Sequence, residues 1–173
     1  MWDYPRPPAV VPDSRSIEIR ASGDDHAVLI AASDRSVRVC ETALPPSFYL
    51  PPESVVPGTL RTTVGTSQCE WKGRARYLAV ASRARTDTPR ASRSHAPTPS
   101  PRRSTDAPAV AWCYPDPYPE FADHAGWISF YPDRVACWVD GERVRAQDGG
   151  FYGGWITDDV VGPFKGAPGT SAW

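Results

Sequence analysis

Proline is the residue that most restricts how this chain can fold. The sequence contains twenty prolines and thirteen glycines, which divide its 173 residues into many short pieces. A proline inside a helix removes a hydrogen bond and clashes with the preceding turn, so long helices are disfavoured. Seven tryptophans and seven tyrosines add side chains that pack well on pleated, half-buried surfaces. The sequence therefore predicts an all-β protein with one or two short helices.

The length limits the number of domains. A chain of 173 residues can form one domain with its own hydrophobic core, but it is short for two ordinary domains and a linker. We therefore expect a single β domain over residues 1–173.

Residues 82–108 interrupt the pattern of this domain. The segment has no large apolar residue, five prolines, and six arginines against two aspartates. It cannot bury enough apolar surface to offset the entropy lost on ordering, which predicts a disordered insertion. The rest of the chain is acidic, which argues against a basic nucleic-acid-binding face there. Contact with nucleic acid or anionic lipid is therefore expected only through the insertion.

The sequence shows no pattern of a secretory signal, a membrane span or a metal site. Residues 1–5 lack a basic start followed by an apolar run, and no later run reaches the roughly 18 apolar residues that a span needs. We expect a cytoplasmic protein with reduced thiols. The four cysteines form no Cys-x-x-Cys pair, and no histidine stands at a ligand spacing from them. No metal or cofactor is therefore expected.

Alternating or apolar runs bounded by turn residues predict short antiparallel strands. The turn residues at 33–36 predict a hairpin, and Asp140-Gly141 predicts a type I′ turn in a three-stranded meander. A single helical turn is expected to begin at Pro52. We expect strands at residues 16–21, 26–32, 37–42, 60–64, 75–80, 109–114, 127–131, 135–139 and 142–145, a short helix at 118–124, and an extended tail over 148–173.

Glu41 stands out because of its place in the strand pattern. In a strand over residues 37–42, Val37, Val39 and Glu41 share one face. A carboxylate in line with core valines needs a partner. An ion pair with Lys72 under aromatic walls would provide one and would place polar groups inside a cavity. The alternative is an edge position or a shifted register that leaves Glu41 in water.

The block Cys69-Glu70-Trp71-Lys72-Gly73 combines a thiol, an amine and an aromatic ring beside a glycine. A thiol next to the Lys72 ammonium would ionise more readily, so Cys69 is a candidate catalytic nucleophile. On a regular strand residues 69 and 72 face opposite sides, and the pair requires a turn or bulge that Gly73 would permit. The alternative is that Cys69 is a small buried apolar side chain.

Several segments together resemble the bacterial domain of unknown function 427 family. They include the run Gly150-Phe151-Tyr152-Gly153-Gly154-Trp155-Ile156-Thr157, and the resemblance covers nearly everything except the insertion. It implies a small β domain of the tent-like type, similar to the Mss4-like group, methionine sulfoxide reductases B and the cereblon ligand-binding domain. The segments are Glu41-Thr42 and residues 45–53, 69–77, 111–117 and 149–173.

The chain departs from what the resemblance implies in three respects. The tent-like relatives usually carry zinc on paired Cys-x-x-Cys motifs, which this chain lacks. Ala43-Leu44 stands where a Ser-His pair is expected. A short link is also expected in place of the insertion. The family is sometimes labelled nucleotidyltransferase-like, but that chemistry needs a Gly-Ser turn and spaced aspartates to hold magnesium, and no such string is found.

These observations lead to one main hypothesis on function. The protein is expected to bind a small polar molecule in an aromatic-lined pocket, with Glu41 and Lys72 anchoring the polar groups. The aromatic residues can equally be core, and a catalytic role for Cys69, a nucleotidyltransferase-like activity and an interaction role for the insertion stay open as alternatives. The expected pocket walls are Tyr49, Tyr77, Trp112, Tyr114, Tyr131 and Trp155.

Overall fold

The computed structural model describes residues 8–21, 28–81 and 107–170. Within these ranges antiparallel strands dominate, and the helical elements are two short 3₁₀ helices. The all-β class predicted from the proline and aromatic content is confirmed. Residues 82–106, most of the predicted insertion, lie outside the described residues. None of the helices in these ranges is long and apolar enough to cross a membrane.

The first sheet has the strand order β1-β4-β5. Its edge strand β1 lies where the sequence analysis predicts no strand, and Pro12 in that strand is opposite Val37. A proline is tolerated on an edge strand because its missing N–H removes no bond within the sheet interior. The strands are β1 (Ala9–Asp13), β4 (Ser36–Cys40) and β5 (Ser47–Tyr49).

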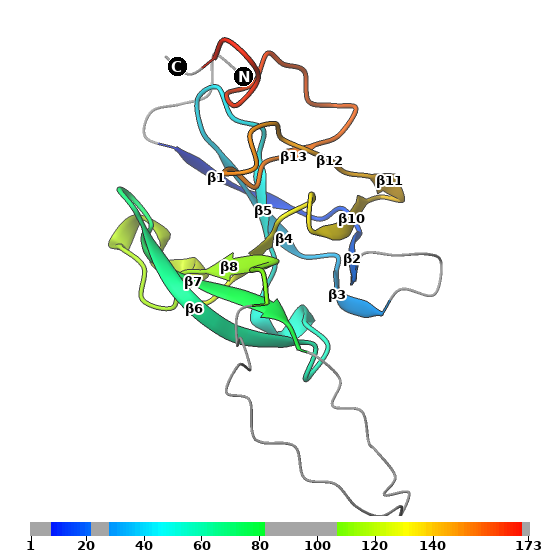
Figure 1. The fold of residues 1–173 in the computed structure, drawn as a ribbon, viewed down its shortest axis with the longest axis vertical. Coiled ribbons are helices and arrows are strands. Elements are labelled where there is room, and N and C mark those ends of the chain that lie inside the picture. Colours follow the sequence, from blue (N-terminus) through cyan, green and yellow to red (C-terminus); the bar gives the residue numbers. More distant parts are fainter. Residues whose placement is uncertain (1–7, 22–27, 82–106, 171–173) are drawn as a thin grey trace, which may run out of the picture.

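The second sheet has the order β11-β10-β2-β3 and forms one side of the molecule, at the right in Figure 1. Asp140 and Gly141 join β10 to β11 with φ angles of 49° and 80°, which confirms the predicted type I′ turn. The strands are β2 (Ile17–Ala21), β3 (Leu29–Ser33), β10 (Val135–Val139) and β11 (Glu142–Arg143).

The third sheet has the order β6-β7-β8-β9. Strand β6 is longer than predicted, and its pairing with β7 is irregular around Gly65, which has a φ of 93°. A bridge between Leu50 and Ile128 joins the end of β5 to β9, so the first and third sheets meet there. The strands are β6 (Leu60–Cys69), β7 (Gly73–Val80), β8 (Ala111–Cys113) and β9 (Ile128–Phe130).

The remaining elements are a short two-stranded ribbon and two helical turns. Strand β12 (Arg145–Ala146) pairs with β13 (Trp155–Ile156), so the segment predicted as an irregular tail contains a strand. The helices η1 (Pro52–Ser54) and η2 (Pro119–His124) each begin with proline, which suits a first helical turn because its N–H is not needed there. Both confirm the short helices predicted at these positions.

Two predicted strand pairings are wrong. The residues at 33–36 bend the chain, but β3 pairs with β2 whereas β4 pairs with β1 and β5. The predicted meander fails in the same way, because β9 pairs with β8 and β10 pairs with β2. In both places the chain passes from one sheet to another. Local turn chemistry bends the chain, but the choice of strand partner depends on which faces can be buried together.

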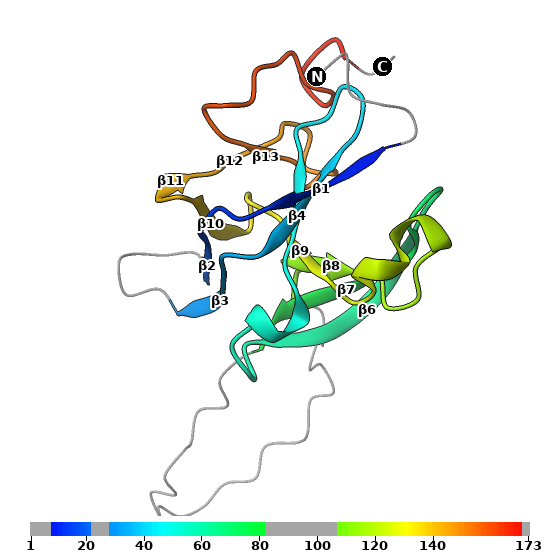
Figure 2. The same ribbon diagram turned by 180° about the vertical axis from the view of Figure 1, so that it is seen from behind.

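Two hydrophobic clusters lie on opposite faces of β5 and β8. Strand β8 lies near the middle of the ribbon in both views (Figures 1 and 2). On β5 and its extension, Phe48 and Leu50 belong to one cluster, and Tyr49 between them belongs to the other. On β8 the alternation repeats, with Trp112 on the side of Tyr49. The first, mainly aliphatic cluster we call the aliphatic core. The second, which contains most of the tyrosines, we call the aromatic cluster.

Candidate functional site

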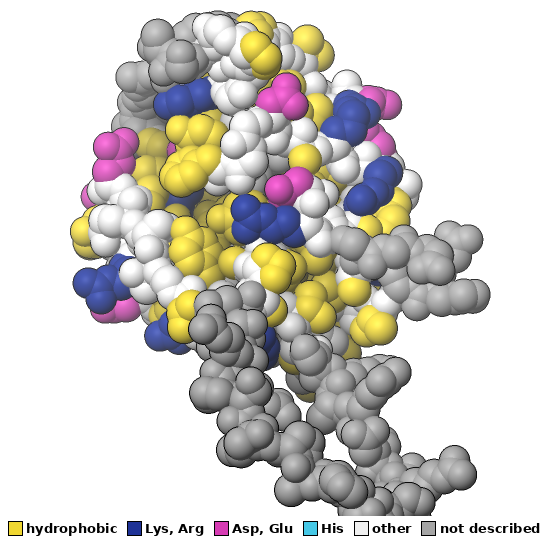
Figure 3. Space-filling view, in the orientation of Figure 1, with side chains coloured by type: hydrophobic (Ala, Val, Ile, Leu, Met, Phe, Trp, Pro, Cys, Tyr) yellow, Lys and Arg dark blue, Asp and Glu magenta, His cyan; other side chains and the backbone are white. Residues whose placement is uncertain are grey.

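A cavity of about 450 Å³ lies over the aromatic cluster. Its volume falls within the range of roughly 300–1,000 Å³ that is typical of small-molecule sites. In the space-filling view, hydrophobic side chains gather in the hollow at the middle of this face (Figure 3). Eight of the nine predicted site residues line the cavity: Glu41, Tyr49, Cys69, Lys72, Tyr77, Trp112, Tyr114 and Tyr131.

The loop between β6 and β7 brings Cys69 and Lys72 to the cavity. Cys69 is paired with Gly73, so residues 70–72 form a three-residue hairpin loop. Gly73 has a φ of 99°, which a residue with a side chain rarely adopts. A Cβ at this position would also contact the backbone of Asp116 and Tyr118. The strand parity that would separate residues 69 and 72 therefore does not apply, because a turn lies between them.

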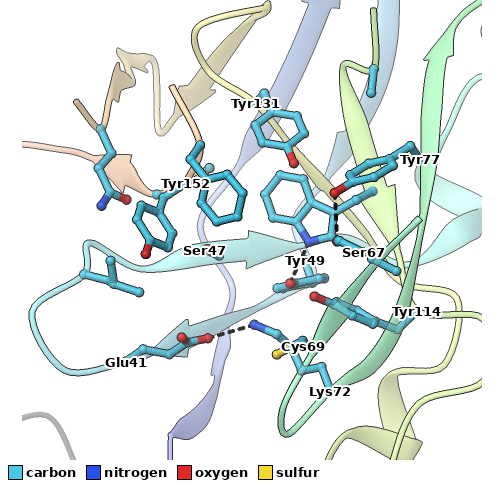
Figure 4. A pocket seen from close by; sticks show the side chains of 18 of the residues that line it. Glu41, Ser47, Tyr49, Ser67, Cys69, Lys72, Tyr77, Tyr114, Tyr131 and Tyr152 are labelled. Carbon is cyan, nitrogen blue, oxygen red and sulfur yellow. Dashed lines mark hydrogen bonds and ion pairs between the residues drawn. The ribbon is translucent and has the colours of Figure 1, made fainter. Parts of the chain in front are cut away.

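Lys72 and Glu41 form an ion pair at one end of the cavity, with 2.8 Å between Lys72 Nζ and Glu41 Oε1 (Figure 4). The Lys72 side chain is 7% exposed and the Glu41 side chain 26% exposed. Of the two alternatives for Glu41, the structure therefore has the ion pair. Glu41 lies just beyond the end of β4, so its position continues the face of Val37 and Val39 without belonging to the strand.

Aromatic rings surround the Lys72 ammonium. Its Nζ atom lies 4.6 Å from the ring centroid of Trp71, 5.6 Å from that of Tyr49 and 5.8 Å from that of Tyr114. Such contacts stabilise a cation through the negative faces of the rings. Together with Glu41 they allow a buried positive charge at this position.

The floor of the cavity is a fixed pair of aromatic side chains. Trp112 Nε1 donates a hydrogen bond of 2.9 Å to the Tyr49 hydroxyl, and their rings meet edge to face. Tyr49 is fully buried, and this burial raises the pKa of its hydroxyl well above the ordinary value. Tyr49 is therefore a neutral hydroxyl at physiological pH. It accepts the bond from Trp112 and keeps its own proton.

Three further tyrosines direct hydroxyls toward the same space (Figure 4). Burial raises the pKa of Tyr114, whose hydroxyl lies beside the Cys69 thiol. Burial and the neighbouring Tyr77 raise the pKa of Tyr131 to about 12. Tyr77 donates a 2.8 Å hydrogen bond to Ser67 Oγ on β6. The cavity is thus lined by neutral groups that donate or accept hydrogen bonds, in addition to the charged pair.

A glycine-rich segment from 149 to 154 covers one side of the cavity, and we call it the strap. A Cβ at Gly153 would overlap the Trp112 ring, and one at Gly154 would overlap Pro45 and Gln147. Only glycine allows the strap to lie this close. Tyr152 in the strap lines the cavity, and Arg134 holds the strap through a 3.3 Å hydrogen bond to the Gly150 carbonyl.

Trp155 is the one predicted site residue that does not line the cavity. It is fully buried in the aliphatic core, stacks on Phe48, and donates a 3.0 Å hydrogen bond to the Phe130 carbonyl. Its place on β13 turns the side chain away from the cavity, which the sequence pattern of the tail does not reveal. We therefore leave Trp155 out of the site.

Sequence reasoning missed several residues of the cavity wall. Arg134 and Gln147 carry no pattern that would have identified them, because tertiary packing alone brings them to the site. Tyr152 could have been found, since it lies in the glycine run that carries the family resemblance. Leu44, which stands where the resemblance implies a histidine, also lines the cavity. The departure at that position therefore alters the wall of the site itself.

Comparison with known proteins bears on the same residues. The sequence pattern of the family described as Domain of unknown function (DUF427) matches residues 9–141, which is more than half of the chain. The chain belongs to this family. The matched part of this DUF427 protein includes Glu41, Cys69 and Lys72, whereas the strap lies beyond it. No curated protein matches the chain.

In residues 8–21, 28–81 and 107–170 no group of three or more histidine, cysteine, aspartate or glutamate side chains is arranged to hold a metal ion. Among the four cysteines, all free thiols, Cys69 is half-buried and the other three are buried.

Proposed function

We propose that the cavity binds a small polar molecule. The observation that carries the proposal is the Lys72 ammonium, which is nearly buried and lines the cavity. Burying a charged side chain has a cost in desolvation that a core built for stability alone would avoid. The aromatic walls supply apolar contact area, and the tyrosine hydroxyls supply groups that can orient a ligand.

A search for a co-purified ligand tests the proposal directly. Native mass spectrometry of the intact protein, purified without denaturation, is expected to show a bound small molecule that is released on unfolding. The variant Leu44→Trp should lose this mass, because the larger side chain fills part of the cavity. Val161→Trp is the matched control, since Val161 is 77% exposed and does not line the cavity.

Two results would contradict the proposal. One is that the purified protein carries no bound mass and that no member of a small-molecule fragment library perturbs the indole resonance of Trp112. The other is that Leu44→Trp and Val161→Trp retain the same bound mass, because the molecule would then lie elsewhere.

A catalytic role for Cys69 is a second candidate. It is supported by the place of this thiol in the cavity, beside the Tyr114 hydroxyl and on the same loop as Lys72. Cys113 is buried, and burial raises the pKa of its thiol, so it serves as an internal reference. An ionised nucleophile should react with iodoacetamide faster than Cys113 at neutral pH.

Greater exposure alone would also speed the reaction of Cys69, so a second comparison is needed. If Lys72 promotes the thiolate, Lys72→Met should slow the alkylation of Cys69, while Lys165→Met, which removes a lysine outside the cavity lining, should not. Equal rates in the two variants would leave Cys69 as a wall residue. The alternative partner role of the arginine-rich insertion falls on residues outside the described structure.

A further inference from the structure

The ion pair in the cavity has unused hydrogen-bonding capacity on both partners. An ammonium has three N–H donors, and a carboxylate can accept several hydrogen bonds. Within the described residues, the hydrogen bond of the Lys72 ammonium is the one to Glu41 Oε1, and Glu41 Oε2 makes no side-chain bond. A donor and an acceptor therefore stand next to each other at the end of the cavity.

The pair also selects on charge. Lys72 and Glu41 sum to zero, so a ligand that carries a single charge would meet the like charge within a few ångströms. Arg134, the other cation of the lining, is held by the carbonyls of Ala109 and Gly150 and by Asp133 at 3.6 Å. Its charge is therefore already compensated at the rim. A ligand without net charge therefore has the smallest electrostatic cost on entering the cavity.

The walls select on shape. Trp112 and Tyr131 lie with ring centroids 4.4 Å apart, and the Tyr152 ring faces the cavity from the strap (Figure 4). Flat aromatic surfaces make the most contact with a flat ligand, because the two can stack without gaps. The same walls offer little to a branched or strongly hydrated molecule.

We propose that the ligand is a planar, uncharged molecule with an amide group, whose carbonyl oxygen accepts from Lys72 and whose N–H donates to Glu41. This inference rests on the proposed binding function and names the chemical class of the ligand. An amide presents an acceptor and a donor on neighbouring atoms, which complements the donor and acceptor of the ion pair. It satisfies both charged groups and adds no charge to the cavity.

Three probes of nearly equal shape test the ligand class in the wild-type protein. Benzamide, benzoate and benzamidinium are uncharged, negative and positive at neutral pH. Each would be titrated into ¹⁵N-labelled protein, and affinity would be read from the shifts of backbone and indole resonances around the cavity. Benzamide is expected to bind about tenfold more tightly than either ion, as the net value of a hydrogen bond to a charged group implies.

Charge variants should redirect this preference. Glu41→Gln leaves Lys72 as the charge of the pair and should make benzoate the tightest of the three probes, whereas Lys72→Gln should favour benzamidinium. Asp158→Asn is the control, because Asp158 lies in an exposed ion pair with Arg145 and should leave the ranking unchanged. The wild-type ranking decides the question even if a variant fails to fold.

Tighter binding of benzoate or benzamidinium to the wild-type protein would overturn the amide assignment and leave the proposed binding function standing. Absence of binding by all three probes would also overturn it, while the binding function is decided separately by the co-purified mass. If the folded Glu41→Gln variant binds the three probes in the same order of affinity as the wild type, Glu41 does not affect the preferred charge of the ligand. This result would also overturn the assignment.

Discussion

The aliphatic core and the aromatic cluster are made by alternate residues of the same strands, yet they differ in content. The core side of β8 carries Ala111 and Cys113, and the other side carries Trp112 and then Tyr114. The core side is closed, and the other side borders a cavity. A strand with period two can therefore place a packed core on one face and the lining of a cavity on the other.

The chemistry of the side chains explains the difference. Branched aliphatic groups interlock without polar atoms, so their packing is complete and does not constrain hydrogen bonds. Tyrosine and tryptophan are rigid, and each brings one polar group that needs a partner. Two such pairs in the aromatic cluster are Trp112 with Tyr49 and Tyr77 with Ser67, whereas the buried indole N–H of Trp71 has no partner among the described residues. We infer that these fixed hydrogen bonds keep the aromatic rings from moving into the cavity.

The largest expected effect comes from truncating the aliphatic core. Leu50 is fully buried. Leu50→Ala should lower the free energy of unfolding by about 2–5 kcal/mol, because it removes apolar contacts and leaves a void. Chemical denaturation measures this loss. The neighbouring Tyr49→Phe removes a single hydroxyl on the other face and should cost about 1–3 kcal/mol. If Tyr49→Phe lowers the free energy of unfolding more than Leu50→Ala does, the aromatic cluster contributes more to stability than the aliphatic core at these positions, contrary to this prediction.

The ion pair of the cavity should contribute more than an exposed pair of the same chemistry. Glu41→Gln leaves the nearly buried Lys72 ammonium without its carboxylate and should cost about 1–3 kcal/mol. Asp158→Asn removes the partner of Arg145, where the two side chains are 81% and 53% exposed, and should cost at most about 1 kcal/mol. Equal losses in the two denaturation curves would mean that the cavity pair is effectively solvated.

Alkaline pH should destabilise the protein in part through Tyr131 of the aromatic cluster. The pKa of Tyr131 is raised to about 12, whereas a tyrosine in the unfolded chain has a pKa of about 10. The unfolded state therefore loses its proton first, and the contribution of Tyr131 to stability is complete below about pH 10 and falls as the pH rises toward 12. The loss should be about 1 kcal/mol per pH unit in that window.

Denaturation curves at several alkaline pH values check this slope. In Tyr131→Phe the loss of stability per pH unit should be smaller, because the titrating hydroxyl is gone. The control is Tyr118→Phe, which changes a 44% exposed tyrosine at the start of η2 and should leave the slope as in the wild type. The same slope in Tyr131→Phe as in the wild type would show that Tyr131 does not contribute.

The features that were predicted correctly are those that depend on residues close together in the sequence. Strands β2 and β10 and the Asp140-Gly141 turn were predicted at their observed positions, because alternation and turn chemistry act over a few residues. Strand β1 was missed because Pro12 argues against a strand, and edge placement overrides that argument. The wrong hairpin partners have a similar origin, since pairing is decided between segments far apart in sequence.

The candidate site shows the same division. Strand alternation was enough to mark Glu41 as a carboxylate that needs a partner, and composition was enough to suggest aromatic walls. Whether Lys72 could be that partner depended on the hairpin loop before Gly73, which brings Cys69 and Lys72 to the cavity.

The sequence by itself determined the all-β class, the short elements and the family, because these depend on residue type and local spacing. Only the tertiary structure decided that alternate residues of β5 and β8 serve two different clusters, that Trp155 belongs to the core, and that Arg134 and the strap close the cavity. These outcomes require surfaces that are distant in sequence to meet, and their packing energies appear only once the strands are assembled.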